Sequence, residues 1–216
     1  MRDMLAAAKM ALRLVVLPLG DSITEGVPTE DGYRAFLAQE LAAAGIDVAW
    51  AGSRRSAAGA HEGWSGITTE ELLPRLRATL ARTRPDVVLL HIGTNDLGLG
   101  VSIGRATDNV NRILEEIDRR SRADAKAPAI RVYVAKIIGR NLPGGESDDE
   151  LLAYNARLTD VVAARKKAGQ PVELVDVHAA VDPARDLADA LHPTAAGYRK
   201  IARAWAAALR PRPIQR

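Results

Sequence analysis

The chain has 216 residues, with 30 Lys and Arg against 27 Asp and Glu, so its net charge is small. No five-residue run is uniformly cationic and aromatic residues make up only 4% of the sequence, which argues against a nucleic-acid partner. Because cysteine is absent, disulfides, thiolate catalysis and cysteine-based metal sites are excluded. The length and a hydrophobic content of 47% predict one domain over residues 1–216.

The first apolar run follows positive charges at Arg2, Lys9 and Arg13, as the apolar region of a signal peptide does. Cleavage after this run would fall within residues 19–22 and destroy the motif described below. No segment reaches about 18 consecutive apolar residues, the length that indicates a transmembrane helix. With Met1 as the natural start, we expect a cytoplasmic protein without membrane insertion.

Apolar runs and helical patterns alternate along the chain. The expected strands span residues 14–19, 47–51, 87–92, 130–138 and 172–177. The apolar positions of the expected helices lie within residues 33–41, 72–80, 110–117, 151–162 and 194–209. Loops are expected over residues 53–66, 93–104, 139–147 and 182–193. This alternation predicts a three-layer α/β/α sandwich around a central, mainly parallel five-stranded sheet.

Polar side chains follow three of the expected strands, at the edge where open α/β sheets keep their sites. Ser22 follows the first strand, Asn95 follows the strand over residues 87–92, and Asp189 and His192 follow the last. A serine nucleophile needs a base, an acid that fixes the tautomer of that base, and donors aimed at the oxyanion. The i, i+3 spacing of Asp189 and His192 can place the carboxylate on one imidazole nitrogen and leave the other for Ser22. Together these residues predict a serine hydrolase site.

Four short segments resemble the sequence blocks of the SGNH (GDSL-type) hydrolases, in the order of that family. They are Gly20-Asp21-Ser22, Trp64-Ser65-Gly66, Gly93-Thr94-Asn95-Asp96 and Asp189-x-x-His192-Pro193. Within the superfamily, the longer stretches around these segments are similar to carbohydrate esterase family 3, the acetyl xylan esterase type. The resemblance spans residues 14–209 and implies a flavodoxin-like SGNH hydrolase fold.

The resemblance also implies roles for individual residues. Ser22 would be the nucleophile, His192 the general base and later acid, and Asp189 the residue that orients His192. The backbone N–H groups of Ser22 and Gly66 and the side-chain amide of Asn95 would form the oxyanion hole. No metal and no cofactor is expected. The implied reaction is hydrolysis of short-chain carboxylic esters, with an acetylated sugar or small molecule as substrate.

Two departures from the family pattern affect the site. Ile23 stands where the GDSL name has Leu, and Ala190 stands where the carbohydrate esterase type more often has Gly. Candidate pocket residues are Asp21, Trp64 and Leu191. Asp21 can also brace its own loop through the backbone, and Trp64 can either line a pocket or pin its loop to the core. The loops over residues 98–104 and 139–147 favour an open site that suits short acyl groups.

Several other polar residues are rivals for the site. Ser65 lacks the preceding strand of a nucleophile elbow, and Asp186 has the less suitable i+6 spacing to His192. His61 and Glu62 resemble half of a metal site, but we expect them in an exposed polar loop. His91 is expected to be semi-buried with its hydrogen bonds satisfied. A further pair for acid–base chemistry is Asp176 with His178.

Other functions use the same residues differently. An acyltransferase, a thioesterase or a lactonase would need the same triad and a different pocket. A flavodoxin-like nucleotide binder would use residues 20–24 as a phosphate loop, which the charge of Asp21 opposes. A catalytically silent binding module on the same fold is the remaining alternative. The oligomeric state does not follow from the sequence.

Overall fold

The computed structural model describes residues 12–141 and 148–210, so Arg2, Lys9 and most of the expected loop 139–147 lie outside it. The strands are β1 (Leu12–Gly20), β2 (Ile46–Trp50), β3 (Arg54–Ser56), β4 (Gly59–Gly63), β5 (Val87–His91), β6 (Arg131–Ala135) and β7 (Val172–Val175). The long helices are α2 (Arg34–Ala43), α3 (Thr69–Arg82), α5 (Ile103–Arg122), α6 (Asp149–Lys167) and α8 (Ala195–Leu209). Short helical turns are α1 (Ser22–Glu25), α4 (Thr94–Gly98), η2 (His178–Ala180) and α7 (Pro183–Asp186).

Five strands run parallel in the order β2-β1-β5-β6-β7, which confirms the predicted parallel core. The hairpin β3–β4 enlarges this sheet to seven strands, because β4 pairs with the end of β1 and β3 runs antiparallel to β4. The expected loop over residues 53–66 and the count of five strands were therefore wrong. The hairpin is rich in Gly, Ser and Ala and has no apolar pattern of its own: β4 forms by pairing with the edge of β1, and β3 forms by pairing with β4.

Pro18 lies inside β1, the central strand, although proline cannot donate to a sheet ladder. The carbonyls of Val16 and Gly20 face the same edge of β1, where they accept from the N–H groups of Ala51 and Trp64. Because strand residues alternate, the nitrogen of Pro18 faces this edge midway between them. Pairing with β2 ends at Val16 and pairing with β4 begins at Leu19. Pro18 thus lies between the part of this edge that pairs with β2 and the part that pairs with β4, where the missing N–H costs no ladder hydrogen bond.

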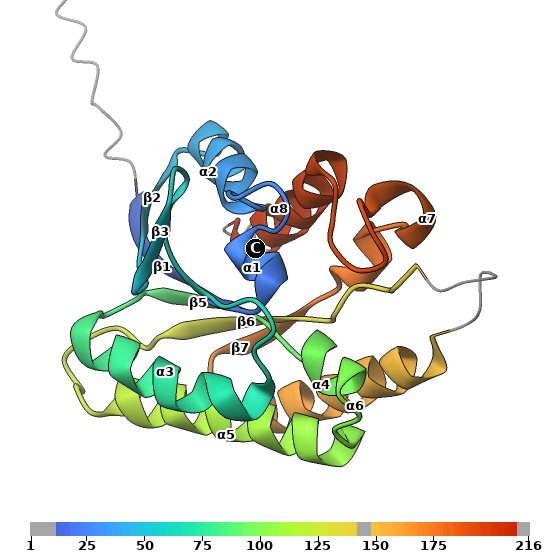
Figure 1. Ribbon diagram of the computed structural model, residues 1–216. Coiled ribbons are helices and arrows are strands. Elements are labelled where there is room, and N and C mark those ends of the chain that lie inside the picture. The colour runs from blue at the N-terminus through green and yellow to red at the C-terminus, as the bar shows by residue number, and fades with distance from the viewer. Residues whose placement is uncertain (1–11, 142–147, 211–216) are drawn as a thin grey trace, which may run out of the picture.

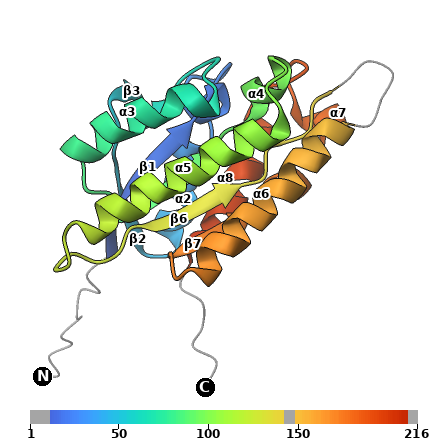
Figure 2. The same ribbon diagram turned by 90° about the horizontal axis from the view of Figure 1, so that it is seen from below.

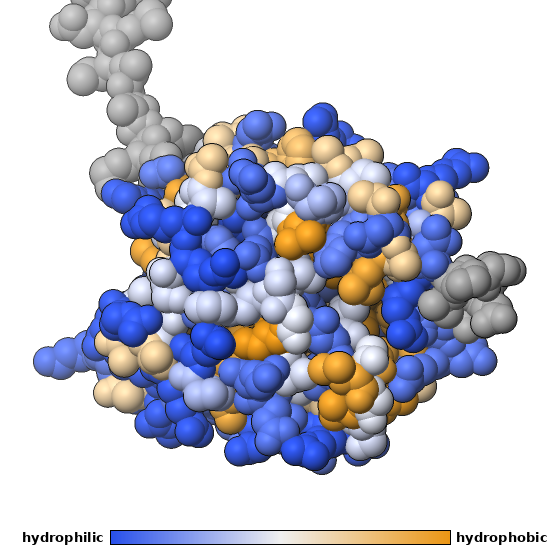
Figure 3. All heavy atoms as spheres, viewed as in Figure 1, coloured by the Kyte–Doolittle hydropathy of each residue, from blue (hydrophilic) through white to orange (hydrophobic). Residues whose placement is uncertain are grey.

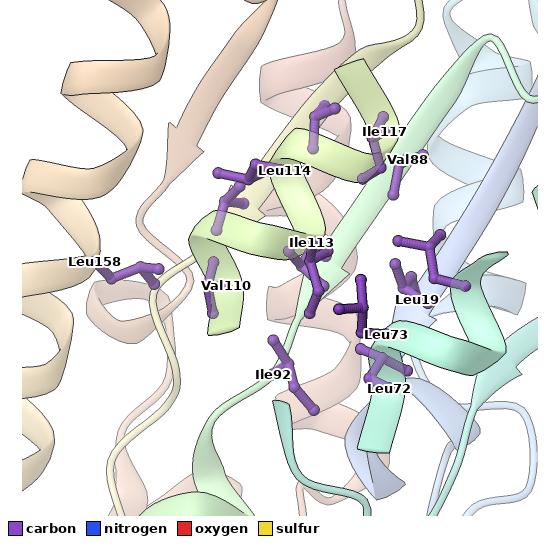
Figure 4. Packing of buried hydrophobic residues seen from close by; sticks show 14 of the residues in the cluster. Leu19, Leu72, Leu73, Val88, Ile92, Val110, Ile113, Leu114, Ile117 and Leu158 are labelled. Carbon is purple, nitrogen blue, oxygen red and sulfur yellow. The ribbon is translucent and has the colours of Figure 1, made fainter. Parts of the chain in front are cut away.

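Helices cover both faces of the sheet (Figures 1 and 2), with α3, α5 and α6 on one face and α2 and α8 on the other. Alternate strand residues enter the two cores, so Leu17 and Leu19 pack toward α3 and α5 while Leu14 and Val16 pack toward α2 and α8. Figure 4 shows Leu19 and Val88 of the sheet facing leucines of α3 and apolar residues of α5. Burial on both faces explains the continuous apolar runs of the parallel strands.

The surface in Figure 3 is largely hydrophilic, with small apolar patches, one of which lies over α4. Leu99, directly after α4, is 70% exposed. Among residues 12–141 and 148–210, no helix is long and apolar enough to cross a membrane.

Candidate active site

Loops at the carboxyl ends of the strands bring four polar residues to one edge of the sheet. Ser22 begins α1 directly after β1, Asn95 lies in α4 after β5, and Asp189 and His192 lie between α7 and α8. His192 Nε2 lies 3.0 Å from Ser22 Oγ, and His192 Nδ1 lies 2.9 Å from Asp189 Oδ2. A continuous hydrogen-bonded chain therefore runs from a carboxylate through an imidazole to a hydroxyl.

The turn that carries His192 is organised by the carboxylate of Asp189. Asp189 Oδ1 accepts the backbone N–H groups of Leu191 and His192, each at 2.7 Å, while Oδ2 meets the imidazole. Burial alone would raise the pKa of Asp189, but these hydrogen bonds outweigh it and lower the pKa to about 2. Asp189 is therefore an anion at neutral pH and holds His192 with its Nδ1 protonated.

Asp186, the rival acid, serves a different purpose. Its side chain is buried and accepts from Lys200 Nζ at 2.6 Å and from the N–H of Asp182 at 2.7 Å. Its carbonyl accepts both the N–H and the hydroxyl of Thr194, the N-cap of α8. Asp186 thus joins α7 to α8, and Asp189 alone of the two reaches His192.

Ser22 is presented by a short helix that its neighbours hold in place. The Asp21 side chain caps α1 by accepting the N–H of Ile23 at 3.0 Å. A Cβ on Gly20 would lie 2.0 Å from the carbonyl oxygen of His91, so only glycine permits this approach of β1 to β5. Asp21 braces the loop as expected, but its placement in the substrate pocket was wrong, because Asp21 is fully buried and is not accessible to a substrate.

Arg34 lies fully buried beneath α1 and binds the end of this helix. Its guanidinium donates to the carbonyls of Thr24, Glu25 and Glu30, and to Ser56 Oγ at 2.8 Å. The guanidinium therefore satisfies carbonyls that the short helix leaves without intrahelical donors.

Replacing Arg34 with Met is expected to lower the free energy of unfolding by about 3 to 5 kcal/mol, because each buried carbonyl left without a donor costs about 1–3 kcal/mol. Urea denaturation of wild type, Arg34→Met and Arg34→Lys measures the loss, and Lys should recover part of it through its own donors. A loss below about 1 kcal/mol for Arg34→Met would show that these bonds do not hold α1.

The three expected oxyanion donors belong to α1, to the turn before α3 and to α4. The N–H of Ser22, in the first turn of α1, has no intrahelical acceptor. Gly66 has a φ of +77° and lies in an exposed turn before α3. Asn95 Nδ2 donates to the carbonyl of Ile67 at 2.9 Å, and an amide nitrogen carries two hydrogens, so this bond uses one of them.

Two hollows flank these donors. Trp64, half-buried, lines one with Gly66 and Arg75, and it is also pinned because its Nε1 donates to Glu62 at 3.0 Å. Leu191 lines the other hollow, whose wall includes Asn95, Leu99 and Arg140. Trp64 thus lines a hollow and is also held by a hydrogen bond, and Leu191 lines the other hollow; their role in a substrate pocket stays a prediction.

His61 and Glu62 are not in an exposed loop, since both lie in β4 and are buried. Glu62 accepts from Ser53, Thr79 and Trp64, which replaces its lost hydration. Burial, together with the positive charges of Arg34 and Arg54, lowers the pKa of His61 to about 4, so this ring is neutral at pH 7.

His91 also differs from expectation, because it is fully buried in β5. Neither ring nitrogen has a hydrogen-bond partner among the described residues, and Nδ1 lies 3.9 Å from Asp21 Oδ1.

The other rivals are engaged elsewhere. Ser65 Oγ donates to Glu25 at 2.6 Å. Asp176 accepts from Lys136 and from the N–H of Ala179 rather than from the His178 ring. In the described part of the chain, no three His, Asp or Glu side chains are grouped as a metal site requires.

The family model of the GDSL-like Lipase/Acylhydrolase family matches residues 19–200, a range that contains Ser22, Gly66, Asn95, Asp189 and His192. The chain belongs to this family. The resemblance to SGNH (GDSL-type) hydrolases that the four segments indicated is thereby confirmed.

Individual relatives agree with this membership. A multidomain esterase of Ruminococcus flavefaciens is 29% identical over 219 residues, which cover 88% of this chain and 28% of that protein; the chain thus spans less than a third of its length. A family 3 carbohydrate esterase of Clostridium thermocellum is 28% identical, with a TM-score of 0.75 over 92% of this chain and 100% of the other. An acetyl esterase solved as a serine-to-alanine variant with an acetate ion is 24% identical, with a TM-score of 0.77 over 91% and 96% of the two chains. These structures confirm the predicted α/β fold.

Proposed function

We propose that the protein is a serine esterase that removes short acyl groups, acetyl above all, from a sugar or another small alcohol. The observation that carries this proposal is the hydrogen-bonded chain from Asp189 through His192 to Ser22. Beside it lie donors suited to a developing oxyanion, and the family includes esterases with this fold.

The chain of hydrogen bonds sets the direction of proton transfer. Ser22 Oγ attacks the carbonyl carbon of the ester, and its proton passes to His192 Nε2. Asp189 stabilises the imidazolium that results. When the tetrahedral intermediate collapses, the bond to the alcohol oxygen breaks and His192 protonates the departing alcohol. Water then attacks acyl-Ser22 with His192 as base, which releases the carboxylic acid and restores the hydroxyl.

In the proposed mechanism, hydrogen-bond donors stabilise the negative charge that develops on the former carbonyl oxygen. In this proposal the donors are the N–H groups of Ser22 and Gly66 and the second hydrogen of Asn95 Nδ2, all carried by elements that are formed before the substrate binds. Fixed donors of this kind lose little energy to reorganisation, and each accounts for about 100- to 1000-fold in turnover.

Short acyl groups and water as acceptor are favoured by the openness of the site. The side chains of Asp189 and His192 are 53% and 20% exposed, and Ser65 and Gly66 lie on the surface. Water therefore reaches the acyl-enzyme readily, which favours hydrolysis over acyl transfer. The proteins of similar structure include a carbohydrate esterase and an acetyl esterase, which supports an acetylated sugar as the substrate class.

Hydrolysis of p-nitrophenyl esters from acetate to decanoate tests this proposal. The expected kcat/KM is highest for acetate and falls steeply beyond butyrate, because the hollows that the described residues form beside the triad are open to solvent. Ser22→Ala, assayed in parallel without added metal, serves as the control and should lose on the order of 10⁶-fold in kcat. A preference for octanoate or decanoate would overturn the short-chain assignment, and a folded wild type that hydrolyses none of the esters would overturn the esterase proposal.

A further inference from the structure

Glu25, the last residue of α1, connects the helix of the nucleophile to the loop of the oxyanion donor. Its Oε2 accepts the N–H of Ser65 at 2.8 Å and the hydroxyl of Ser65 at 2.6 Å. Its Oε1 lies 2.7 Å from a guanidinium nitrogen of Arg54. Ser65 immediately precedes Gly66, so Glu25 holds the residue on one side of the proposed donor.

The other side of Gly66 is held as well. We call residues 64–67 the oxyanion loop. Asn95 Nδ2 donates to the carbonyl of Ile67 at 2.9 Å, and the N–H of Trp64 donates to the carbonyl of Gly20 at 3.0 Å. The residues on both sides of Gly66 are therefore held by hydrogen bonds. Glu25 holds Ser65, and Asn95 holds Ile67.

Packing does not hold Gly66 itself. A Cβ placed on Gly66 would meet no atom within 4 Å, and both Ser65 and Gly66 are exposed. At its base, by contrast, the loop touches α1 closely, since a Cβ on Gly63 would lie 2.3 Å from the nitrogen of Glu25. We therefore infer that the direction of the Gly66 N–H is set mainly by hydrogen bonds of its neighbours, among them the turn bond from the Ile67 N–H to the Trp64 carbonyl at 3.2 Å.

The charge of Glu25 strengthens this connection. Burial opposes ionisation, but the hydrogen bonds from Ser65 and the charge of Arg54 outweigh it and lower the pKa of Glu25. Hydrogen bonds to an ionised carboxylate are roughly twice as strong as neutral ones. Arg54 in turn donates to the carbonyl of Gly63 at 2.8 Å, and its guanidinium lies 4.7 Å from the centre of the Trp64 ring. The carboxylate and its arginine thus hold the residues that precede Gly66, while Asn95 holds Ile67 on the other side.

We propose that Glu25 is a positioning residue that fixes the oxyanion loop relative to Ser22, so that the N–H groups of Ser22 and Gly66 point at one oxygen. The proposal rests on the esterase function proposed above. In this proposal Glu25 takes no part in the proton transfer of the triad and only positions the oxyanion loop.

The test compares Glu25→Ala and Glu25→Gln with wild type. Misplacement of a reacting group by about 1 Å costs on the order of 100-fold, so Glu25→Ala should lower the kcat for p-nitrophenyl acetate about 10- to 100-fold with KM within about twofold. Glu25→Gln keeps an oxygen that can accept from Ser65, so it should recover most of kcat and remain within about 5-fold of wild type. Ser65→Ala, which keeps the backbone bond, should fall between wild type and Glu25→Ala.

Glu40→Ala is the matched control. Glu40 is 30% exposed against 23% for Glu25 and also pairs with arginine, but it lies in α2 and contacts Arg203 and Arg210 of the opposite end of the fold. Its loss should change kcat by less than about twofold. Thermal unfolding of every variant shows whether an effect on kcat accompanies a loss of the fold.

A second readout does not depend on activity. Amide-resolved NMR of Glu25→Ala should show the order parameters of Ser65 and Gly66 falling from about 0.85 toward 0.6, with no change in Glu40→Ala. If Gly66 stays rigid in Glu25→Ala, the inference is overturned, whether or not the protein hydrolyses esters. If the wild type hydrolyses no ester but Gly66 becomes mobile in Glu25→Ala, the esterase proposal is overturned and the positioning role of Glu25 still holds. With an active wild type, a kcat for folded Glu25→Ala within twofold of wild type, or a loss confined to KM, would also overturn it.

Discussion

Ser22→Ala and His192→Ala are each expected to lower kcat for p-nitrophenyl acetate on the order of 10⁶-fold, and the double variant is expected to be no worse. The hydroxyl and the imidazole are joined by one hydrogen bond of 3.0 Å and act in the same proton transfer. Once either group is missing, the other has nothing to exchange a proton with, so the losses cannot add.

Steady-state kinetics of the two single variants and the double variant measures this coupling. The oxyanion donors remain in all three, so a residual rate above the uncatalysed reaction should persist at about the same level. Losses that multiply in the double variant would show that Ser22 and His192 contribute separately, and the proposed mechanism would then be wrong.

Asp189→Asn is expected to lower kcat on the order of 10³- to 10⁴-fold without unfolding the protein. Asn can still accept the N–H groups of Leu191 and His192 through its oxygen, because Asp189 Oδ1 does so now. The amide NH₂ would then face His192 Nδ1. This nitrogen would have to become the acceptor, and the proton would move to Nε2, where it blocks abstraction of the Ser22 proton.

The pH dependence follows from the depressed pKa of Asp189, which is about 2. A carboxylate with a lowered pKa stabilises the fold above the pKa of the unfolded chain, about 3.9, and this contribution is lost as the pH falls through about 2. Asp189 therefore stays ionised across the range of activity. Protonation of Asp189 should therefore cause no step in the pH profile of wild-type kcat/KM above about pH 4, and a pH–rate profile measures this.

Asp186→Asn is the matched control, since it removes the other carboxylate of this loop. Its loss weakens the pair with Lys200 and the bond from Asp182, so stability should fall by about 1–3 kcal/mol while kcat changes less than about threefold. The opposite pattern, with Asp186→Asn inactive and Asp189→Asn active, would assign the role of the acid to Asp186.

Much of this architecture is visible in the sequence because parallel strands buried on both faces must be apolar throughout. The runs over residues 14–19 and 87–92 therefore indicate strands, and the polar residues at which they stop mark the edge of the sheet. Ser22 and Asn95 fall there for that reason. The short spacing of Asp189 and His192 made their contact predictable as well, since three residues within one turn are enough to bring the two side chains together.

The hairpin and the buried charges could not be predicted in the same way. β4 becomes a strand by pairing with an edge of β1, and β3 by pairing with β4, and a local sequence pattern does not reveal either partner. Glu62 is buried because Thr79, 17 residues away, supplies a donor. Arg34 looks like a surface helix residue until α1 folds over it. In each case a polar residue is buried by partners distant in the sequence, and residue type alone points to the surface.

Labelling with an alkyl fluorophosphonate tests the central claim most directly, since such reagents react with a serine that an adjacent base and oxyanion donors activate. Mass spectrometry of the intact wild-type protein and of its peptides would count the phosphonyl groups and locate them. We predict one group per chain, on Ser22, and none on Ser22→Ala or His192→Ala. A group on Ser65, or a folded wild type that takes up none, would contradict the assignment of Ser22 as the nucleophile.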